Sequence, residues 1–195
     1  MVEVNERVIT EATHRGRNLL LRELVALIER YHHHNSPGIA RETIETYGKV
    51  LADKHAYQID TEDLMKEIDE HLVEVETWVD NTALYPVNGR VSAYPTQWHE
   101  ELGGSTDVRA YLQFLQNEDS GFTHDSAGAG QGIPEEDLLD IVATVGRTDR
   151  QEAKATLSDL RQRGDLVEGP DQHPDAGVRL AENAEHLRDE SLSKS

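Results

Sequence analysis

The sequence IPEEDLLDIVATVGRTDRQEAKATLSDLRQRGDLVE, residues 133–168, contains the clearest succession of elements in the chain. Pro134 is typical of the start of a helix, and that helix places its apolar residues on one face: Leu138, Ile141, Val142 and Val145. The turn at 146–147 follows, and then a capping box, in which the Thr148 hydroxyl accepts from an amide and Gln151 reaches back. The helix after this box is expected to end at Gly164, the usual residue beyond a helix C-terminus.

The elements around this stretch complete a recognisable order. A helix is expected from Asp107 to about Asn117, capped by Ser105 or Thr106, and a Gly-rich loop spans 119–132. Two strands are expected over 165–168 and 178–181. The order from residue 107 is therefore helix, loop, helix, tight turn, helix, strand, long turn, strand. This is the order of a winged helix-turn-helix, whose recognition helix follows the tight turn and whose wing is the strand pair.

Three strings in this region carry a resemblance to a known family. They are Ile133–Ile141, Glu152–Leu160 and Arg163–Glu168. Through them, residues 107–181 resemble the C-terminal winged-helix domain of archaeal minichromosome maintenance helicases. No Gly-x4-Gly-Lys-Ser/Thr motif occurs in the chain, so the resemblance does not extend to an ATPase. It implies a winged-helix fold in a replication setting.

The expected recognition helix separates its charges. At about 100° per residue, Arg150, Lys154 and Arg161 fall on one stripe. Residues 147–163 contain five basic and three acidic residues, a local charge of +2 in a chain of −19. The sequence therefore predicts a DNA-binding surface made of six residues: Arg147, Arg150, Lys154, Ser158, Arg161 and Arg179. The alternative is a solvated face with i, i+4 ion pairs on a winged helix that binds another protein.

The first half of the chain is expected to form a helical domain over 1–94. Long amphipathic helices are predicted over 4–31 and about 39–55, and a third after its N-cap Asp60 and the staple residue Ile59. The buried stripe of this third helix is expected to comprise Leu64, Ile68, Leu72, Val75 and Val79. Asn88-Gly89 then predicts a hairpin between strands at 83–87 and 90–94.

Two interpretations of this first domain stay open at the level of sequence. Three helices followed by a hairpin can be a second winged helix, or a helical bundle with one hairpin. The third helix is strongly acidic, so we expect a scaffold or dimerisation surface there. Tandem winged helices of this length are similar to small acidic accessory subunits of chromosome-condensing complexes. The predicted fold class is mainly α with short β-hairpins, a winged helix over 95–181 and a tail over 182–195.

The composition indicates a salt-adapted protein. The 195 residues include 38 Asp and Glu against 19 Lys and Arg, a net charge of −19, with the acidic residues spread along the whole chain. This balance resembles proteins of salt-in halophiles; an acidic mesophilic protein is the alternative. With no cysteine, no signal peptide and no long apolar run, we expect a cytoplasmic protein without a membrane association.

No motif predicts an enzyme, a metal site or a cofactor. Adjacent histidines at 32–34 point to different faces of a helix, and His99-Glu100-Glu101 lacks a second histidine. The glycine-rich run 128–132 follows no apolar strand, so it does not predict a phosphate loop. A hydrolase with an unrecognised site is the weakest option.

The sequence therefore predicts a protein that binds double-stranded DNA in replication or transcription regulation, as a homodimer through its first helix. The alternative is a protein-binding winged-helix adaptor in a replication or chromosome-organising complex. A contiguous positive patch on the Arg150, Lys154 and Arg161 face favours DNA. An acidic or apolar surface there favours the adaptor.

Overall fold

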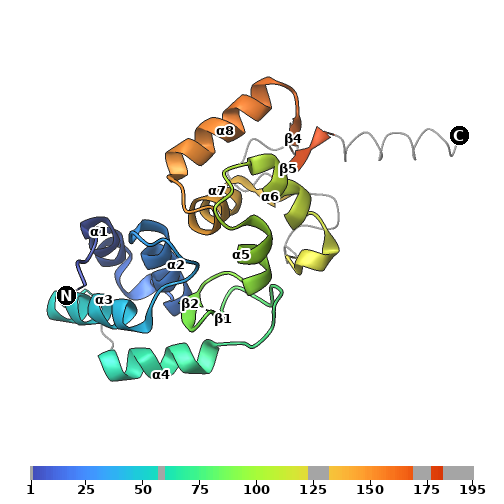
Figure 1. Ribbon diagram of the computed structural model, residues 1–195. Coiled ribbons are helices and arrows are strands. Elements are labelled where there is room, and N and C mark those ends of the chain that lie inside the picture. Colours follow the sequence, from blue (N-terminus) through green and yellow to red (C-terminus); the bar gives the residue numbers. More distant parts are fainter. Residues whose placement is uncertain (1, 57–59, 123–131, 169–176, 182–195) are drawn as a thin grey trace, which may run out of the picture. The chain divides into compact units, whose positions relative to one another are not determined.

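The computed structural model describes residues 2–56, 60–122, 132–168 and 177–181, and it divides the chain into two compact units (Figure 1). The N-terminal unit is Met1–Gly103 and the C-terminal unit is Gly104–Ser195. The protein is mainly helical with two small antiparallel sheets, which confirms the expected class. The boundary along the chain falls between residues 103 and 104, whereas the sequence predicts it between 94 and 95. The difference arises because the helix at 96–102 belongs to the N-terminal unit.

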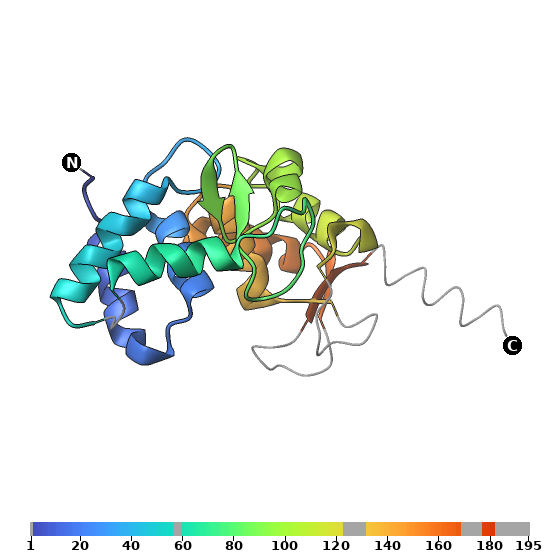
Figure 2. The ribbon, with the colours of Figure 1, turned by 90° about the horizontal axis from the view of Figure 1, so that it is seen from below.

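The N-terminal unit consists of five helices and a hairpin in its described part. In chain order these are α1 (Glu6–Arg15), the 3-10 turn η1 (Gly16–Asn18), α2 (Leu21–Tyr31), α3 (Arg41–Asp53), α4 (Thr61–His71), β1 (Tyr85–Val87), β2 (Arg90–Ser92) and α5 (Thr96–Leu102). Helix α4 packs along α3 (Figure 2). Gly48 permits this approach, since a Cβ atom there would lie 2.6 Å from Leu64 Cδ2.

The expected single helix over 4–31 is wrong, because the chain breaks it at Gly16. Gly16 has φ 54° and ψ −127°, a backbone conformation that residues other than glycine rarely adopt. Leu20 is extended just before α2 begins. The break lets both helices bury an apolar face in the same core: Val8, Ile9 and Ala12 from α1, and Leu24, Leu27 and Ile28 from α2. The continuous helix expected to mediate a dimer therefore does not exist, and the dimer itself stays a prediction.

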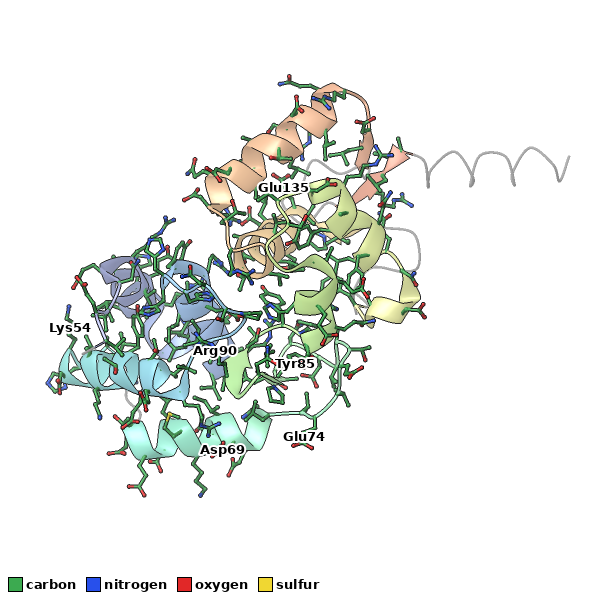
Figure 3. All side chains as sticks on the ribbon, viewed as in Figure 1. Lys54, Asp69, Glu74, Tyr85, Arg90 and Glu135 are labelled. Carbon is green, nitrogen blue, oxygen red and sulfur yellow. The ribbon has the colours of Figure 1, made fainter. Side chains whose placement is uncertain are left out.

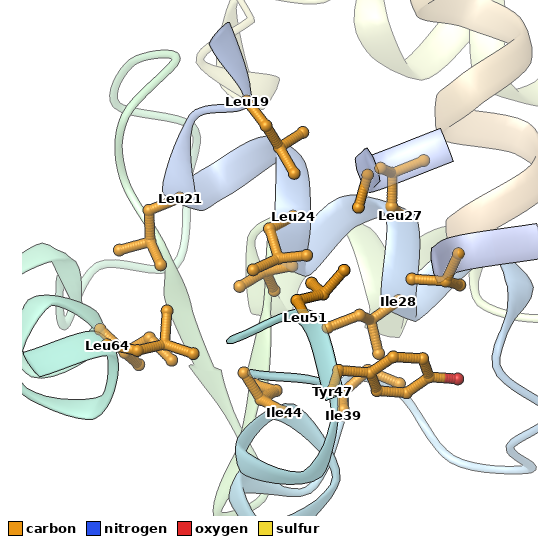
Figure 4. Packing of buried hydrophobic residues seen from close by; sticks show 14 of the residues in the cluster. Leu19, Leu21, Leu24, Leu27, Ile28, Ile39, Ile44, Tyr47, Leu51 and Leu64 are labelled. Carbon is orange, nitrogen blue, oxygen red and sulfur yellow. The ribbon is translucent and has the colours of Figure 1, made fainter. Parts of the chain in front are cut away.

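The core of the N-terminal unit lies between α2, α3 and α4 (Figure 4). Its side chains without exposed surface include Leu24, Ile28, Ile44, Tyr47, Leu51 and Leu64. Tyr47 is an aromatic ring within this core whose hydroxyl accepts from the backbone N–H of Asn5 at 2.8 Å. That bond ties the segment before α1 to α3.

Helix α4 is capped as predicted but ends earlier than predicted. The Asp60 carboxylate accepts from the backbone N–H of Glu62, which confirms the N-cap, while Ile59 lies outside the described residues. The expected buried stripe is wrong beyond the helix: Val75 and Val79 are 44% and 50% exposed. After His71 the chain is extended and bonds to the segment beside β1, so helical spacing no longer applies.

The predicted hairpin is confirmed. Asn88 and Gly89 both have positive φ, 51° and 77°, as the two central residues of a tight hairpin turn require. The strands pair with Tyr85 opposite Ser92. Beside the hairpin, the rings of Trp78 and Trp98 stack at a centroid distance of 5.4 Å, so Trp78 anchors the connection between α4 and β1.

The C-terminal unit consists of helices and a three-stranded sheet in its described part. The elements are α6 (Val108–Leu115), the 3-10 turn η2 (Glu118–Ser120), β3 (Ile133–Pro134), α7 (Glu135–Val145), α8 (Arg150–Gln162), β4 (Leu166–Glu168) and β5 (Gly177–Leu180). The sheet order is β3-β5-β4, with both pairs antiparallel. The two later strands were predicted; β3, which pairs Ile133 with Val178, was not.

Two predicted caps are corrected in this unit. Asp107, rather than Ser105 or Thr106, caps α6 by accepting from the backbone N–H of Arg109. Asp149, rather than Thr148, caps α8. In both cases a carboxylate lies directly before the first helical residue, where its oxygen reaches the second amide.

Several expectations fall on residues that the structure does not describe. These are most of the loop at 119–132, the long turn between the two wing strands, and the tail over 182–195. None of the helices in the described ranges combines the length and apolar character that a membrane span requires.

Candidate nucleic-acid interface

Helix α8 is held in place by one buried face and two well-defined ends. Ala153, Leu157 and Leu160 are buried against the rest of the C-terminal unit. The Asp149 carboxylate accepts from the backbone N–H of Gln151 at 2.7 Å, and Gly164 has φ 78° just beyond the end. A helix therefore lies where the sequence predicts the recognition helix, and it buries the predicted residues.

Arg150, the first residue of α8, is paired with carboxylates of α7. Its Nε donates to Asp140 Oδ1 at 3.0 Å, and its guanidinium also pairs with the Glu136 carboxylate. Partial burial lowers the pKa of Arg150, but the two carboxylates outweigh it and raise that pKa above the ordinary value. Arg150 therefore carries a fixed charge that two neighbouring acids already compensate.

Arg161, near the other end of α8, is compensated in the same way. One of its terminal nitrogens donates to Glu135 Oε2 at 2.8 Å, and Glu135 is the first residue of α7 (Figure 3). Arg163 pairs within α8 itself, with Asp159 Oδ2 at 2.9 Å. The arginines of α8 are thus engaged by acids of the same unit.

Lys154 and Ser158 remain available on the predicted interface. Lys154 is exposed, and within the described ranges no ion pair engages it. Ser158 is half-buried beside it on the helix. Of the three residues on the predicted basic stripe, only Lys154 presents a charge without a carboxylate partner in the described part of the unit.

The row of α8 opposite its buried face is uncharged. Steps of about 100° per residue place four residues there: Gln151, Ala155, Ser158 and Gln162. The row on one side of it contains Arg150, Lys154 and Arg161, and the row on the other side contains Glu152 and Asp159. Helix α8 therefore presents a neutral row between a mostly compensated basic row and an acidic row.

The two predicted residues outside α8 lie on separate elements. Arg147 is exposed in the turn between α7 and α8, with φ 52°. Arg179 lies on β5 opposite Val167 of β4 and is half-buried. Its side-chain stem packs near Gly132, where a Cβ atom would come within 2.8 Å of Arg179 Cγ.

The charge balance reverses once α7 is counted with α8. Residues 135–165 contain eight acidic and five basic residues, a net charge of −3. The sequence prediction of a local +2 counted only 147–163, which omits the acids at the start of α7. Those acids contact Arg150 and Arg161 directly, so carboxylates compensate two of the three residues of the predicted basic stripe.

The N-terminal unit contains a buried polar cluster that the sequence did not predict. Glu29, Ser92 and His99 lie within hydrogen-bonding reach of one another and are almost fully buried. A serine, a histidine and a carboxylate can perform nucleophilic catalysis, but here the carboxylate contacts the serine and all three are enclosed by protein. The signal available in the sequence was a glutamate that directly follows the apolar run 24–28 in a helical pattern.

Two of the three adjacent histidines, His32 and His34, contact other groups of the protein. His32 Nδ1 lies 2.8 Å from the Tyr47 hydroxyl, and both ring nitrogens of His34 face backbone carbonyls. Within the described ranges, no group of three or more His, Asp or Glu side chains is arranged to hold a metal ion.

Comparison of the chain with protein families, with curated proteins and with solved structures gave no match.

Proposed function

We propose that the C-terminal unit is a winged helix. The supporting observation is the succession α6, β3, α7, α8, β4, β5 together with the sheet order β3-β5-β4. A short strand between the first two helices, paired with the last strand, ties the wing to the helical core. The unpredicted strand β3 therefore adds support beyond the helix order.

On this fold, we propose that the protein is a winged-helix adaptor that binds another protein through α8. The observation that carries the proposal is the pairing of Arg150 and Arg161 with Asp140, Glu136 and Glu135 of α7. A helix that contacts DNA needs uncompensated basic side chains, because the neutralisation of DNA phosphates by Lys and Arg supplies much of the affinity. Here carboxylates of α7 already pair with Arg150 and Arg161, in the place that DNA phosphates would take.

The outward surface of α8 suits a protein partner better than a duplex. The acidic row containing Glu152 and Asp159 would face a phosphate strand on one side of any groove into which α8 inserted. A protein partner can match a neutral row between rows of opposite sign, since complementary charges fix register while the small central residues permit close packing. The expected partner therefore carries both acidic and basic residues around a central contact.

The resemblance of residues 107–181 makes a replication or chromosome-organising complex the expected setting. A binding role rather than catalysis is part of this proposal, and the cluster of Glu29, Ser92 and His99 is enclosed by protein. The acidic composition further supports work in concentrated salt, where specific contacts matter more than net charge.

Duplex DNA is the second candidate ligand, favoured by the exposed charges of Lys154 and Arg147. The ion pairs of Arg150 and Arg161 are partly exposed, and such pairs contribute only about 0–1 kcal/mol. Phosphates could therefore replace the carboxylates at modest cost. The charge of −3 over 135–165 opposes this exchange.

Site-specific photo-crosslinking tests the adaptor. A photoreactive amino acid replaces Ala155 in the outward row, and the matched control replaces exposed Gln113 of α6. In lysate at native salt, we expect one protein adduct from position 155 that the control lacks. The additional substitution Ser158→Arg, in the same outward row, should abolish this adduct. Nucleic-acid adducts at 155, or identical adducts from both positions, would contradict the proposal.

A further inference from the structure

Glu29 of α2 is a carboxylic acid enclosed in the N-terminal unit and held by three groups. Its Oε1 lies 2.7 Å from Ser92 Oγ and 3.5 Å from His99 Nε2, and its Oε2 accepts from the backbone N–H of Ala93 at 3.0 Å. Ser92 Oγ also lies 2.7 Å from His99 Nε2. Glu29, Ser92 and His99, here called the Glu29 network, are 1%, 0% and 6% exposed.

The hydrogen bonds of Ser92 allow two arrangements. Ser92 Oγ has one proton to donate and accepts from the backbone N–H of Tyr94 at 3.0 Å. If Glu29 is ionised, Ser92 donates to it and His99 Nε2 must donate to Ser92. If Glu29 is protonated, it donates to Ser92, and Ser92 donates to an unprotonated His99 Nε2. Both arrangements satisfy the serine. They hold the same number of protons when His99 is an imidazolium in the first, and the first holds one proton fewer when His99 is neutral.

One titrating proton therefore belongs to the whole network rather than to one residue. With that proton present, the network is either a neutral acid beside a neutral imidazole or a carboxylate beside an imidazolium, and both have no net charge. When the proton leaves to solvent, a carboxylate stays buried beside a neutral imidazole. Burial disfavours this carboxylate charge more strongly than its hydrogen bonds and the charge of Arg22 stabilise it.

Few other groups act on the carboxyl of Glu29. Arg22, on the same helix, acts electrostatically, and the backbone N–H of Gly38 donates to it. Arg22 is itself held by a bond to Ala93 O at 2.9 Å and by the ring of Trp78. The neighbouring His34 contacts only the backbone oxygen of Glu29, at 2.7 Å.

We propose that the Glu29 network is a proton-operated latch, which fastens α2 to β2 and α5 while its proton is shared and loosens when that proton is lost. The network joins three elements through one side chain of each: Glu29 from α2, Ser92 from β2 and His99 from α5. Burial raises the pKa of Glu29 to about 7, which puts the release of the proton near neutral pH.

The Glu29 network lies next to a cluster of stacked aromatic rings that contains Trp78 and Trp98, so loosening of the latch should change the surroundings of these rings. Trp98 precedes His99 in α5 and stacks on Trp78, which anchors the connection between α4 and β1. The chain contains two tryptophans, and both lie in this cluster. Tryptophan emission therefore reports directly on the state of the latch.

The test is a pH titration of tryptophan emission and of amide hydrogen exchange over 96–102, in the full chain at molar KCl. For the wild type we expect one transition with a midpoint near pH 7, with faster exchange on the alkaline side. In Glu29→Gln the amide nitrogen donates to Ser92 and the amide oxygen accepts from Ala93, so the variant imitates the protonated network. We expect this variant to lack the transition.

The matched control is Glu42→Gln, which removes an exposed carboxylate from α3 of the same unit and should titrate as the wild type does. A wild type without a transition between pH 5.5 and 8.5, or the same transition in Glu29→Gln, would overturn the latch. If Glu29→Gln does not fold, the side-chain carboxyl carbon of Glu29 is followed by NMR in the wild type. A change near pH 7 supports the latch, and a change together with the exposed glutamates near pH 4.5 overturns it.

Discussion

At the start of α8, Asp149 and Thr148 are adjacent residues with different jobs. Asp149 accepts from the backbone N–H of Gln151, whereas the Thr148 hydroxyl donates to the Glu152 carboxylate at the surface. We expect Asp149→Ala to lower the free energy of unfolding of the C-terminal unit by about 0.5–2 kcal/mol, the usual contribution of a cap. Thr148→Ala, the matched control, should change it by less than about 0.5 kcal/mol. Chemical denaturation of both variants checks this. Equal decreases in the free energy of unfolding would indicate that Thr148 also caps the helix, as the predicted capping box requires.

Glu29 gives the stability of the N-terminal unit a defined pH dependence. Unfolded Glu29 loses its proton near pH 4.5, whereas burial keeps the folded residue protonated up to about pH 7. Between these values the folded state binds more protons, so the free energy of unfolding falls as pH rises, by at most about 1.4 kcal/mol per pH unit. The contribution is complete below pH 4.5 and lost above about pH 7.

Urea denaturation at several pH values measures this slope. We expect Glu29→Gln to remove the decline between pH 4.5 and 7 and to leave other pH effects in place. A wild type whose stability rises over that interval, with the variant following it, would show that Glu29 is not the group responsible.

Local chemistry explains which residues the sequence predicted correctly. Asp60 and the pair Asn88-Gly89 act on backbone atoms two or three positions away, so their roles follow from adjacent residues alone. The partners of Arg150 and Arg161 lie 10 to 26 positions earlier in the chain. Only the packing of α8 on α7 brings them together, and a charge count along one helix cannot include them.

At the scale of elements, Gly16 separates α1 from α2. The periodicity of apolar residues continues through both helices, and a glycine inside a helix costs only about 1 kcal/mol, so the sequence pattern alone favours one helix. The break at Gly16 is favoured because two short helices can both bury their apolar faces in one core. The strand β3 escaped prediction for a related reason: two residues are too few to show alternation.

The backbone of Gly16 makes the break testable. A side chain at φ 54° and ψ −127° is strained, although the space around the position is open. We expect Gly16→Ala to destabilise the N-terminal unit by about 1–3 kcal/mol, measured by thermal unfolding followed through tryptophan emission. Exposed Arg17→Ala is the control and should stay within about 0.5 kcal/mol of the wild type. A stabilised Gly16→Ala would indicate a continuous helix.

At the scale of the whole molecule, the net charge of −19 predicts a dependence on salt. Self-repulsion of the acidic surface is strong in dilute buffer and largely screened at about 1 M salt, where the Debye length is about 3 Å. We expect the melting temperature to rise steeply from about 0.1 M to 2 M KCl, in a thermal melt followed by circular dichroism. A melting temperature that stays flat across that range would remove the halophile interpretation.

The central claim concerns α8: its arginines are compensated by α7, so this surface contacts protein rather than DNA. Three proteins separate the possibilities: the wild type, the variant Glu135→Gln/Glu136→Gln/Asp140→Asn that frees the arginines, and the variant Arg150→Ala/Lys154→Ala/Arg161→Ala that removes the basic row. All three are compared at KCl concentrations at which circular dichroism shows each of them folded.

The decisive measurement is the fluorescence anisotropy of a labelled DNA duplex titrated with these three proteins. We expect no binding by the wild type or the alanine variant, and a gain of binding that weakens with salt when the carboxylates of α7 are neutralised. Duplex binding by the wild type that the alanine variant loses would contradict the account and establish α8 as a DNA-binding helix.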